Sequence, residues 1–194
     1  MKKEDMKIAV VCSSNQNRSM EAHAFLKKKD FDVHSFGSGT QVKLPGASMH
    51  QPNIYDFNTT YEEMYRDLAS KDHQLYTGNG ILRMLDRNRR IKPKPERFQD
   101  SSLLFDMIVT CEERVYDQVL EEFENRTVRL YKPVYVVNID ILDNHEAATL
   151  GAITINDFCQ KVKDSADLDG YIEEVIIRMD NSDWTNLLYA VVFY

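Results

Sequence analysis

The chain has 194 residues, a length that a single hydrophobic core usually accommodates. Its 24 Lys and Arg residues against 31 Asp and Glu residues give a formal net charge of −7, which argues against binding nucleic acid or anionic lipid through an overall cationic surface. Seven glycines and five prolines are too few for a collagen-like or low-complexity chain, and no apolar run approaches the roughly 20 residues that cross a bilayer.

The first predicted element is a strand at 7–11, where an apolar run rich in β-branched residues is typical of a strand buried on both faces. A helix is predicted from Ser19, and Lys27–Lys29 suit its C-terminal end because cations complement the helix dipole there. The alternating segment 31–36 predicts a second strand. Together these elements predict a strand–helix–strand unit at the start of the chain.

The middle of the chain looks different, because glycines and prolines interrupt it from residue 37 to about residue 58. Apolar residues then recur at helical spacing in 60–75 and again in a short segment at 81–87. Residues 92–95 are expected to be extended, because a residue that precedes proline avoids the helical region. We therefore expect an insertion, from about 40 to 100, that caps one edge of the domain.

The last part of the chain returns to alternating strands and helices. A third strand is predicted at 105–110, a helix at 112–125 and a fourth strand at 133–142. A long acidic helical region follows, and its apolar positions are Leu150, Ile153, Ile155, Phe158, Ile172, Val175 and Ile176. A final strand is predicted at 187–194.

This alternation predicts an α/β fold of three layers. We expect a doubly wound, mainly parallel sheet of four to five strands with helices on both faces. Residues 1–194 are interpreted as one domain that carries the cap insertion.

The motif that carries chemistry is Cys12, five small or polar residues, Arg18 and Ser19, placed between the first strand and the first helix. Such a loop can turn its backbone N–H groups inward and bind an anion at a helix N-terminus, and the same field favours a thiolate. Arg18 offers a planar fork for two phosphoryl oxygens, and Ser19 can donate its hydroxyl to the sulfur. The predicted phosphate-binding residues are Ser13, Ser14, Asn15, Gln16, Asn17 and Arg18.

These residues suit phosphoryl transfer through a thiophosphoryl intermediate on Cys12, without a metal or other cofactor. The alternative interpretation is a buried structural cysteine, with Arg18 in a surface ion pair. The position past the carboxyl end of a strand favours the phosphate site, because ligands bind at that edge of open α/β sheets. Cys12, Cys111 and Cys159 form no spaced pairs, which predicts a reducing compartment; Cys111 is interpreted as a core thiol, with a redox role as the alternative.

A phosphatase of this kind also needs a general acid for the leaving oxygen. Asp143 is the first candidate, because it lies just beyond the predicted fourth strand, where a loop can fold over the pocket. Asp140 is the second candidate; it lies within the apolar alternation, and its alternative role is to orient the loop or Arg18. A solvated loop acid is the competing interpretation of Asp143, and His145 is interpreted as a cap or surface residue.

Several segments together resemble the Ssu-type phosphatases of the RNA polymerase II carboxy-terminal domain, and the N-terminal loop resembles the low-molecular-weight tyrosine phosphatase fold. These segments are Val11–His23, Val42–Gly46, Asn79–Asn88, Pro95–Gln99, Cys111–Asp117 and Val192–Tyr194. The resemblance covers essentially the whole chain. It implies a serine phosphatase that acts chiefly at the fifth position of the heptad repeats, when the following Ser–Pro bond is cis.

Residue by residue, the resemblance implies that Cys12 is the nucleophile, Arg18 the phosphate clamp and Asp143 the acid, with Asp140 left open. It also implies a substrate groove shaped by Lys43, Leu44, Pro45 and Met84. The competing interpretation is that Leu44 and Met84 belong to the core of the cap, and that Pro45 and Gly46 form a turn.

The resemblance further implies a role in transcription and mRNA 3′-end processing, with a symplekin-like scaffold and the phosphorylated polymerase tail as partners. Direct contact with nucleic acid or membrane is not expected, and the location is nuclear, with an additional cytoplasmic pool as the alternative. Three other functions remain open: a broader tyrosine phosphatase, an arsenate reductase that would need further reactive thiols, and a scaffold without turnover.

Overall fold

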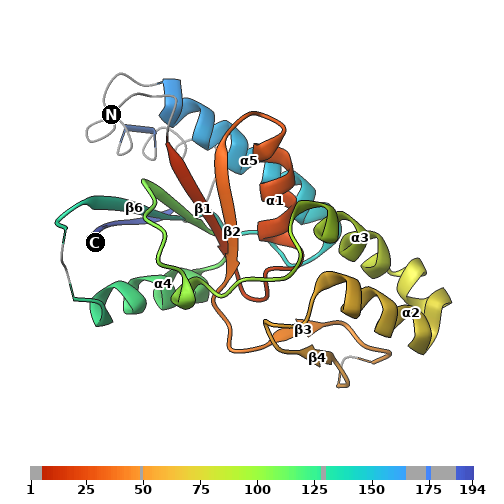
Figure 1. Ribbon diagram of the computed structural model, residues 1–194. Helices are drawn as coiled ribbons and strands as arrows, with labels where there is room; N and C mark the ends of the chain where they lie inside the picture. Colours follow the sequence, from red (N-terminus) through yellow and green to blue (C-terminus); the bar gives the residue numbers. More distant parts are fainter. Residues whose placement is uncertain (1–5, 49, 128–129, 165–173, 176–186) are drawn as a thin grey trace.

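The computed structural model describes residues 6–48, 50–127, 130–164, 174–175 and 187–194 (Figure 1). A central sheet of five strands runs through it in the order β2-β1-β5-β6-β7. The strands are β1 (Lys7–Cys12), β2 (Asp32–Gly37), β5 (Met107–Thr110), β6 (Pro133–Asn138) and β7 (Leu188–Phe193). The first four run parallel to one another, and β7 pairs antiparallel with β6. The predicted α/β class with a mainly parallel sheet is confirmed.

Helices cover both faces of this sheet. On one face, α1 (Arg18–Lys27) and α5 (His145–Asp164) pack on apolar side chains of the parallel strands, such as Val10 and Val109. On the other face, α4 (Glu113–Asn125) packs on a second apolar cluster that includes Ile108 and Val136. Alternate residues of β1 feed the two clusters, which is why its sequence is apolar without interruption.

A third apolar cluster lies in the segment between β2 and β5. It is built from the hairpin β3 (Val42–Leu44) and β4 (Asn53–Tyr55), and from α2 (Tyr61–Gly78) and α3 (Ile81–Ile91). This segment, called the cap below, is placed at one edge of the sheet in Figure 1. Met20 of α1 belongs to the same cluster, so the cap packs directly on the first turns of that helix.

Several predicted boundaries differ from the observed ones. The stretch from 37 to 58 contains the β3–β4 hairpin, whose three-residue strands are too short to show a periodicity. The helix predicted at 60–75 continues to Gly78 through a non-helical residue, Asp72. The helix predicted at 81–87 continues to Ile91, because the arginines of its last turn pair with acids instead of interrupting it.

The strand predicted at 133–142 was too long, and this error affects the site. β6 ends at Asn138, because both of its neighbours end there: β5 stops at Thr110 and β7 starts at Leu188, each opposite Asn138. Residues 139–144 therefore form a loop, called the acid loop below, that leads into α5. Asp140 lies on this loop and is exposed, and not within a strand.

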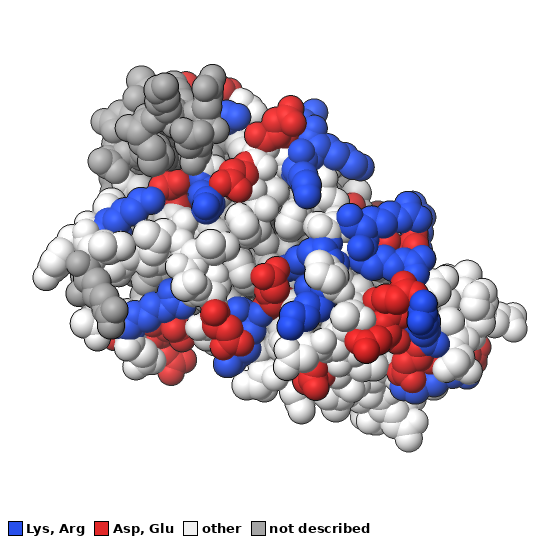
Figure 2. Space-filling model, in the orientation of Figure 1, with Lys and Arg blue, Asp and Glu red and all other residues white. Residues whose placement is uncertain are grey.

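In the acidic C-terminal region, Ile155 and Phe158 are buried on α5, whereas Leu150 and Ile153 are exposed. Val175 is buried, and Ile172 and Ile176 lie outside the described residues. Charges of both signs are interspersed on the face shown in Figure 2. Arg89, for example, pairs with Glu62 and Asp86. In the part of the chain that is described, no helix combines the length and the apolarity needed to cross a bilayer.

Candidate active site

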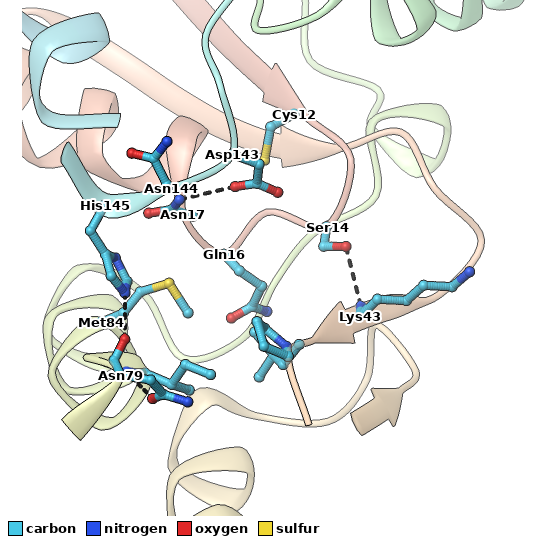
Figure 3. A pocket seen from close by; sticks show the side chains of 13 residues that line it. Cys12, Ser14, Gln16, Asn17, Lys43, Asn79, Met84, Asp143, Asn144 and His145 are labelled. Carbon is cyan, nitrogen blue, oxygen red and sulfur yellow. Dashed lines mark hydrogen bonds between the residues drawn. The ribbon is translucent and has the colours of Figure 1, made fainter. Parts of the chain in front are cut away.

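The Cys12–Arg18 segment joins the end of β1 to the start of α1, at the carboxyl edge of the parallel strands. Cys12 is the last residue of β1 and Arg18 the first of α1, so the five residues between them form the whole connection. This connection, residues 13–17, is called the phosphate loop below. The acid loop and the cap meet it, and the three together line one pocket (Figure 3).

Cys12 is almost fully buried, and its Sγ lies 3.0 Å from the Ser19 Oγ. The Asn15 side-chain amide donates to the same Ser19 Oγ over 3.0 Å. The Asn15 Oδ1 in turn accepts from the Glu96 backbone N–H at 3.0 Å, which fixes the orientation of the amide. Ser19 accepts from Asn15 and still has its own proton, which it can donate to a Cys12 thiolate.

The carbonyl groups of the phosphate loop are turned outward by donors from other parts of the chain. The Cys12 and Ser13 carbonyls accept from the Ser38 and Gly39 N–H groups at 2.9 and 3.0 Å, and the Asn17 carbonyl accepts from the Glu21 N–H at 2.9 Å. The Asn15 carbonyl accepts from the Tyr61 hydroxyl at 2.7 Å, and the Gln16 carbonyl accepts from Asn88 and Arg87, each at 2.9 Å. In a trans peptide the next N–H points the opposite way, so these amides face the inside of the loop and form an anion site.

Two local features let the loop take this shape. Asn15 has a φ of 52°, in the left-handed region that asparagine tolerates better than most residues. Gly37 lies against the loop from β2, where an added Cβ would lie 2.8 Å from the Ser13 carbonyl oxygen. The absence of a side chain at Gly37 therefore allows the close approach of the two segments.

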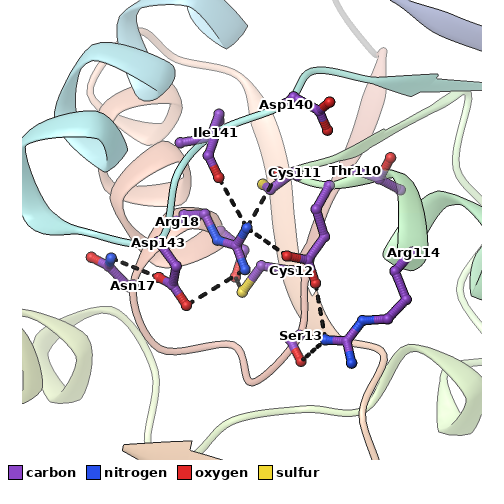
Figure 4. Close-up of polar contacts among 12 residues, drawn as sticks. Cys12, Ser13, Asn17, Arg18, Thr110, Cys111, Arg114, Asp140, Ile141 and Asp143 are labelled. Carbon is purple, nitrogen blue, oxygen red and sulfur yellow. Dashed lines mark hydrogen bonds and ion pairs between the residues drawn. The ribbon is translucent and has the colours of Figure 1, made fainter. Parts of the chain in front are cut away.

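Arg18 is 4% exposed and points from α1 toward the ends of β5 and β6 (Figure 4). Its Nη1 donates to the Glu112 Oε2 at 2.9 Å and to the Ile141 carbonyl at 3.0 Å, while its Nε is buried and has no partner among the described residues. Burial lowers the pKa of Arg18, but the nearby Cys12 and Asp143 charges raise it more, so the net shift is upward. The guanidinium is therefore a fixed cation with one free buried donor.

Glu112 orients this guanidinium. Burial raises the pKa of Glu112, but hydrogen bonds from Arg18 and Arg114 outweigh burial and lower it overall. Glu112 is therefore a carboxylate at neutral pH, and it holds one edge of the Arg18 fork. It was not among the predicted site residues, because nothing in its position directly after Cys111 indicates the contact.

The two candidate acids lie in different places. The Asp143 Oδ1 accepts from the Asn17 side-chain amide at 2.9 Å, and its Oδ2 lies 3.5 Å from the Arg18 Nη2. The Asp140 Oδ1 accepts from the Asn138 side chain at 2.9 Å, and Figure 4 shows Asp140 apart from Cys12, whereas Asp143 lies beside it. Asp143 lines the pocket with Cys12; Asp140 is not among the lining residues.

The pocket has a volume of about 250 Å³, and all four residues predicted for the groove line it: Lys43, Leu44, Pro45 and Met84. Leu44 and Met84 also belong to the buried cluster of the cap, so each side chain contributes to both core and pocket wall. Four further lining residues were not among the predicted site residues: Asn79, Ile81, Asn144 and His145. Asn79 and His145 come from segments far apart in sequence, so only the folded chain brings them together.

The other two cysteines are fully buried. Burial raises the pKa of Cys111 and of Cys159 well above the usual thiol range, so both remain neutral thiols near pH 7. Within the described ranges, no group of three or more His, Cys, Asp or Glu side chains is arranged to hold a metal ion.

Known proteins are similar to this chain in sequence and in structure. The RNA polymerase II C-terminal domain phosphatase SSU72 of Homo sapiens is 55% identical over 194 residues, which is 100% of both chains. The Xenopus laevis protein of the same name is 56% identical over 189 residues, or 97% of each chain.

Among solved structures, Drosophila melanogaster Ssu72 with symplekin, bound to a cis peptidomimetic phosphorylated at the fifth heptad serine, has a TM-score of 0.95 and 50% identity. It covers 98% of this chain and 99% of that one. A second Drosophila structure, of the serine phosphatase of the RNA polymerase II C-terminal domain, has a TM-score of 0.95 and 52% identity, covering 97% and 100%. The family model described as Ssu72-like protein matches residues 6–194, and the chain therefore belongs to the Ssu72 family.

Proposed function

We propose that this chain removes phosphate from phosphoserine at the fifth heptad position of the RNA polymerase II C-terminal domain, when the following Ser–Pro bond is cis. The names of its relatives and the fly complex with a cis phosphopeptide mimic support this substrate. One observation carries the chemistry: Cys12 lies beside a loop whose carbonyls are held outward, and beside a buried Arg18 whose Nε has no partner in the described part of the chain. That arrangement binds a phosphoryl group next to a nucleophile.

In the first step, the Cys12 thiolate attacks phosphorus in line, so an S–P bond forms while the P–O bond to the serine breaks. Phosphate-loop amides and the Arg18 Nε and Nη2 hold the equatorial oxygens, where charge spreads in the transition state. Asp143 gives a proton to the leaving serine oxygen, and its distance of 3.5 Å from the Arg18 Nη2, a donor to the same phosphoryl group, supports this role.

In the second step, a water molecule attacks phosphorus and the S–P bond breaks, which releases inorganic phosphate and the Cys12 thiolate. Asp143, now a carboxylate, takes a proton from the attacking water. Ser19, 3.0 Å from the sulfur, donates its hydroxyl to the departing thiolate. No metal or organic cofactor enters either step.

The shape of the pocket supports a bent Ser–Pro substrate. Leu44, Pro45 and Met84 give it an apolar wall suited to a proline ring, within a volume of about 250 Å³ next to Cys12. A cis bond folds the chain back on itself, so phosphoserine and proline fit one short pocket together. Since only about 10–30% of X–Pro bonds in flexible peptides are cis, turnover would depend on prolyl isomerisation at high enzyme concentration.

We further propose a symplekin-like scaffold as a partner, because the fly relative was solved in complex with symplekin. Action on RNA polymerase II implies a nuclear role, and the finer proposal, an additional cytoplasmic pool, is tested by cell fractionation.

The decisive experiment measures phosphate release from two phosphoserine heptad peptides, one with the following proline locked cis and one with it locked trans. A phosphotyrosine peptide serves as a third substrate, and Cys12→Ser as the blank. The expected result is rapid turnover of the cis peptide alone, with no release by Cys12→Ser.

Equal hydrolysis of both serine peptides, or preference for phosphotyrosine, would contradict the substrate and retain the Cys12 chemistry. No release from any peptide, with tight peptide binding, would favour a scaffold that does not turn over.

A further inference from the structure

A hydrogen bond crosses the mouth of the pocket between its two walls. His145, the first residue of α5, directs its Nε2 at the backbone carbonyl of Asn79 over 3.1 Å (Figure 3). Asn79 lies in the turn between α2 and α3, so this bond joins the α5 side of the pocket to the cap. Both residues line the same pocket as Cys12 and Asp143.

The turn that presents this carbonyl is well fixed. The Asn79 N–H donates to the Leu75 carbonyl at 3.0 Å, and its side-chain Oδ1 accepts from the Ile81 N–H at 3.1 Å. Gly80 follows with a φ of 81°, and a Cβ there would lie 2.9 Å from the His145 Nε2. The imidazole therefore packs against a position where only glycine leaves room. This packing and the hydrogen bond to Asn79 both bring His145 close to the cap.

The chemistry of the bond fixes the proton on the ring. A carbonyl oxygen can only accept, so the His145 Nε2 must carry a hydrogen. The neutral tautomer with Nε2–H and the imidazolium both meet this need, so the contact is kept in either charge state.

The position of His145 links this contact to the acid. The Asn144 Oδ1 accepts from the Ala147 N–H at 2.8 Å, so the residue next to Asp143 caps α5 and moves with it. On its other side, the acid loop is held to the start of α1 by Arg18 at the Ile141 carbonyl, and to the phosphate loop by Asn17 at Asp143. The hydrogen bond from His145 supplies the anchor on the cap side.

We propose that His145 is a positioning residue that holds Asp143 over the phosphate loop by fastening the acid loop to the Asn79 carbonyl of the cap. This inference rests on the proposed function, in which Asp143 is the general acid. His145 does not contact the reacting atoms. It determines the position of the Asp143 carboxyl group when the serine oxygen leaves.

The test compares two substrates that differ in their need for an acid. The alkoxide of serine is a poor leaving group and needs a proton, whereas an acidic phenol leaves without much help. We expect His145→Ala to lower kcat on the cis phosphoserine peptide about 10-fold or more, since small misplacements of catalytic groups are costly. The same variant should keep kcat/KM on an aryl phosphate with an acidic phenol within about twofold, because kcat/KM reports only the steps up to departure of the leaving group and not the later step in which Asp143 acts as a base. KM for the peptide should also stay within about twofold.

Two further variants separate positioning from a merely structural effect. His145→Gln should recover most of the loss, because its side-chain amide can donate from nearly the same place as Nε2. In an Asp143→Asn background, His145→Ala should cost no further activity on the peptide, since there is no acid left to place. Glu146→Ala, at the next exposed position of α5, is the matched control and should behave like the unmodified chain.

Equal losses on both substrates, no recovery by His145→Gln, or an additional loss in the Asp143→Asn background would each overturn the positioning role. Unchanged peptide turnover in Asp143→Asn alone would instead overturn the acid assignment, and the role of His145 with it. Thermal unfolding midpoints of His145→Ala and Glu146→Ala check that both variants are folded.

Discussion

The phosphate loop and the acid loop meet at one pocket but are built in opposite ways. Around the phosphate loop, Asn15 and Ser19 are fully buried, and several donors from distant segments hold its carbonyls. On the acid loop, the side chain of Asp143 is 60% exposed and Leu142 is 75% exposed. The difference teaches that anion binding relies on dipoles fixed in advance, whereas an acid that serves two steps must remain accessible to substrate and water.

The largest loss of activity is expected from a change at the phosphate loop. Arg18→Lys keeps a positive charge but loses the planar fork, the buried Nε and the simultaneous contacts with Glu112 and Ile141. We expect kcat on the cis phosphoserine peptide to fall about 10²–10³-fold, the size of a lost transition-state donor. Steady-state kinetics measures this fall in kcat, and Arg90→Lys, at an exposed position of α3, is the control. A loss of less than tenfold would mean that the fork is not needed.

A somewhat smaller loss of activity is expected from a change on the acid loop. Asp143→Asn removes the proton donor while keeping the shape and the hydrogen bond from Asn17. We expect kcat on the phosphoserine peptide to fall about 10²-fold, the lower range for general acid catalysis. Asp140→Asn is the matched control, because Asp140 lies on the same loop but contacts Asn138. A greater loss for Asp140→Asn than for Asp143→Asn would reverse the assignment.

A substitution in the apolar wall of the pocket should change substrate binding more than it changes catalysis. Met84→Ala shortens a side chain that lines the pocket yet is 6% exposed and packs in the cap cluster. We expect KM for the cis peptide to rise about 5- to 10-fold, consistent with roughly 1–1.4 kcal/mol of lost apolar contact. The value of kcat should change little. A fall in kcat at constant KM would place Met84 with the catalytic groups instead.

The smallest effect on activity is expected at His23, whose contribution is to stability at acid pH. His23 is buried on α1 beside Ser35, and burial, with the nearby Lys92 and Lys27, lowers its pKa to about 3. Between pH 6.5 and about 3 the unfolded chain binds this proton and the folded chain does not. The free energy of unfolding therefore decreases as the pH is lowered through that window, by up to about 1.4 kcal/mol per pH unit from this group.

Urea unfolding at several pH values tests this linkage. His23→Gln, which can still reach Ser35, should lose less stability between pH 6.5 and 4.5 than the unmodified chain, and activity at pH 7 should stay within about twofold. Parallel pH profiles of the two proteins would show that His23 does not contribute.

The parts of the site with local determinants were predictable from the sequence, and the parts with distant determinants were not. The five-residue spacing between Cys12 and Arg18 fixes the phosphate loop within one strand–helix connection, so the loop was predictable. The choice between Asp140 and Asp143 was not, because the end of β6 depends on where β5 and β7 stop. Glu112 and His145 were missed for the same reason, since their partners are 94 and 66 residues away.

The outward-held carbonyls have a consequence for ligand-linked stability. Most of the donors that shape the phosphate loop come from the cap, namely from the residues directly after β2, from α2, from α3 and from the segment before β5, so the anion site depends on the docked cap. An anion that binds this loop therefore binds the folded chain alone, and at 100 times its Kd it should add about 2.7 kcal/mol to the free energy of unfolding. A bound oxyanion such as inorganic phosphate would thus stabilise the contact between two parts of the molecule that are far apart in sequence.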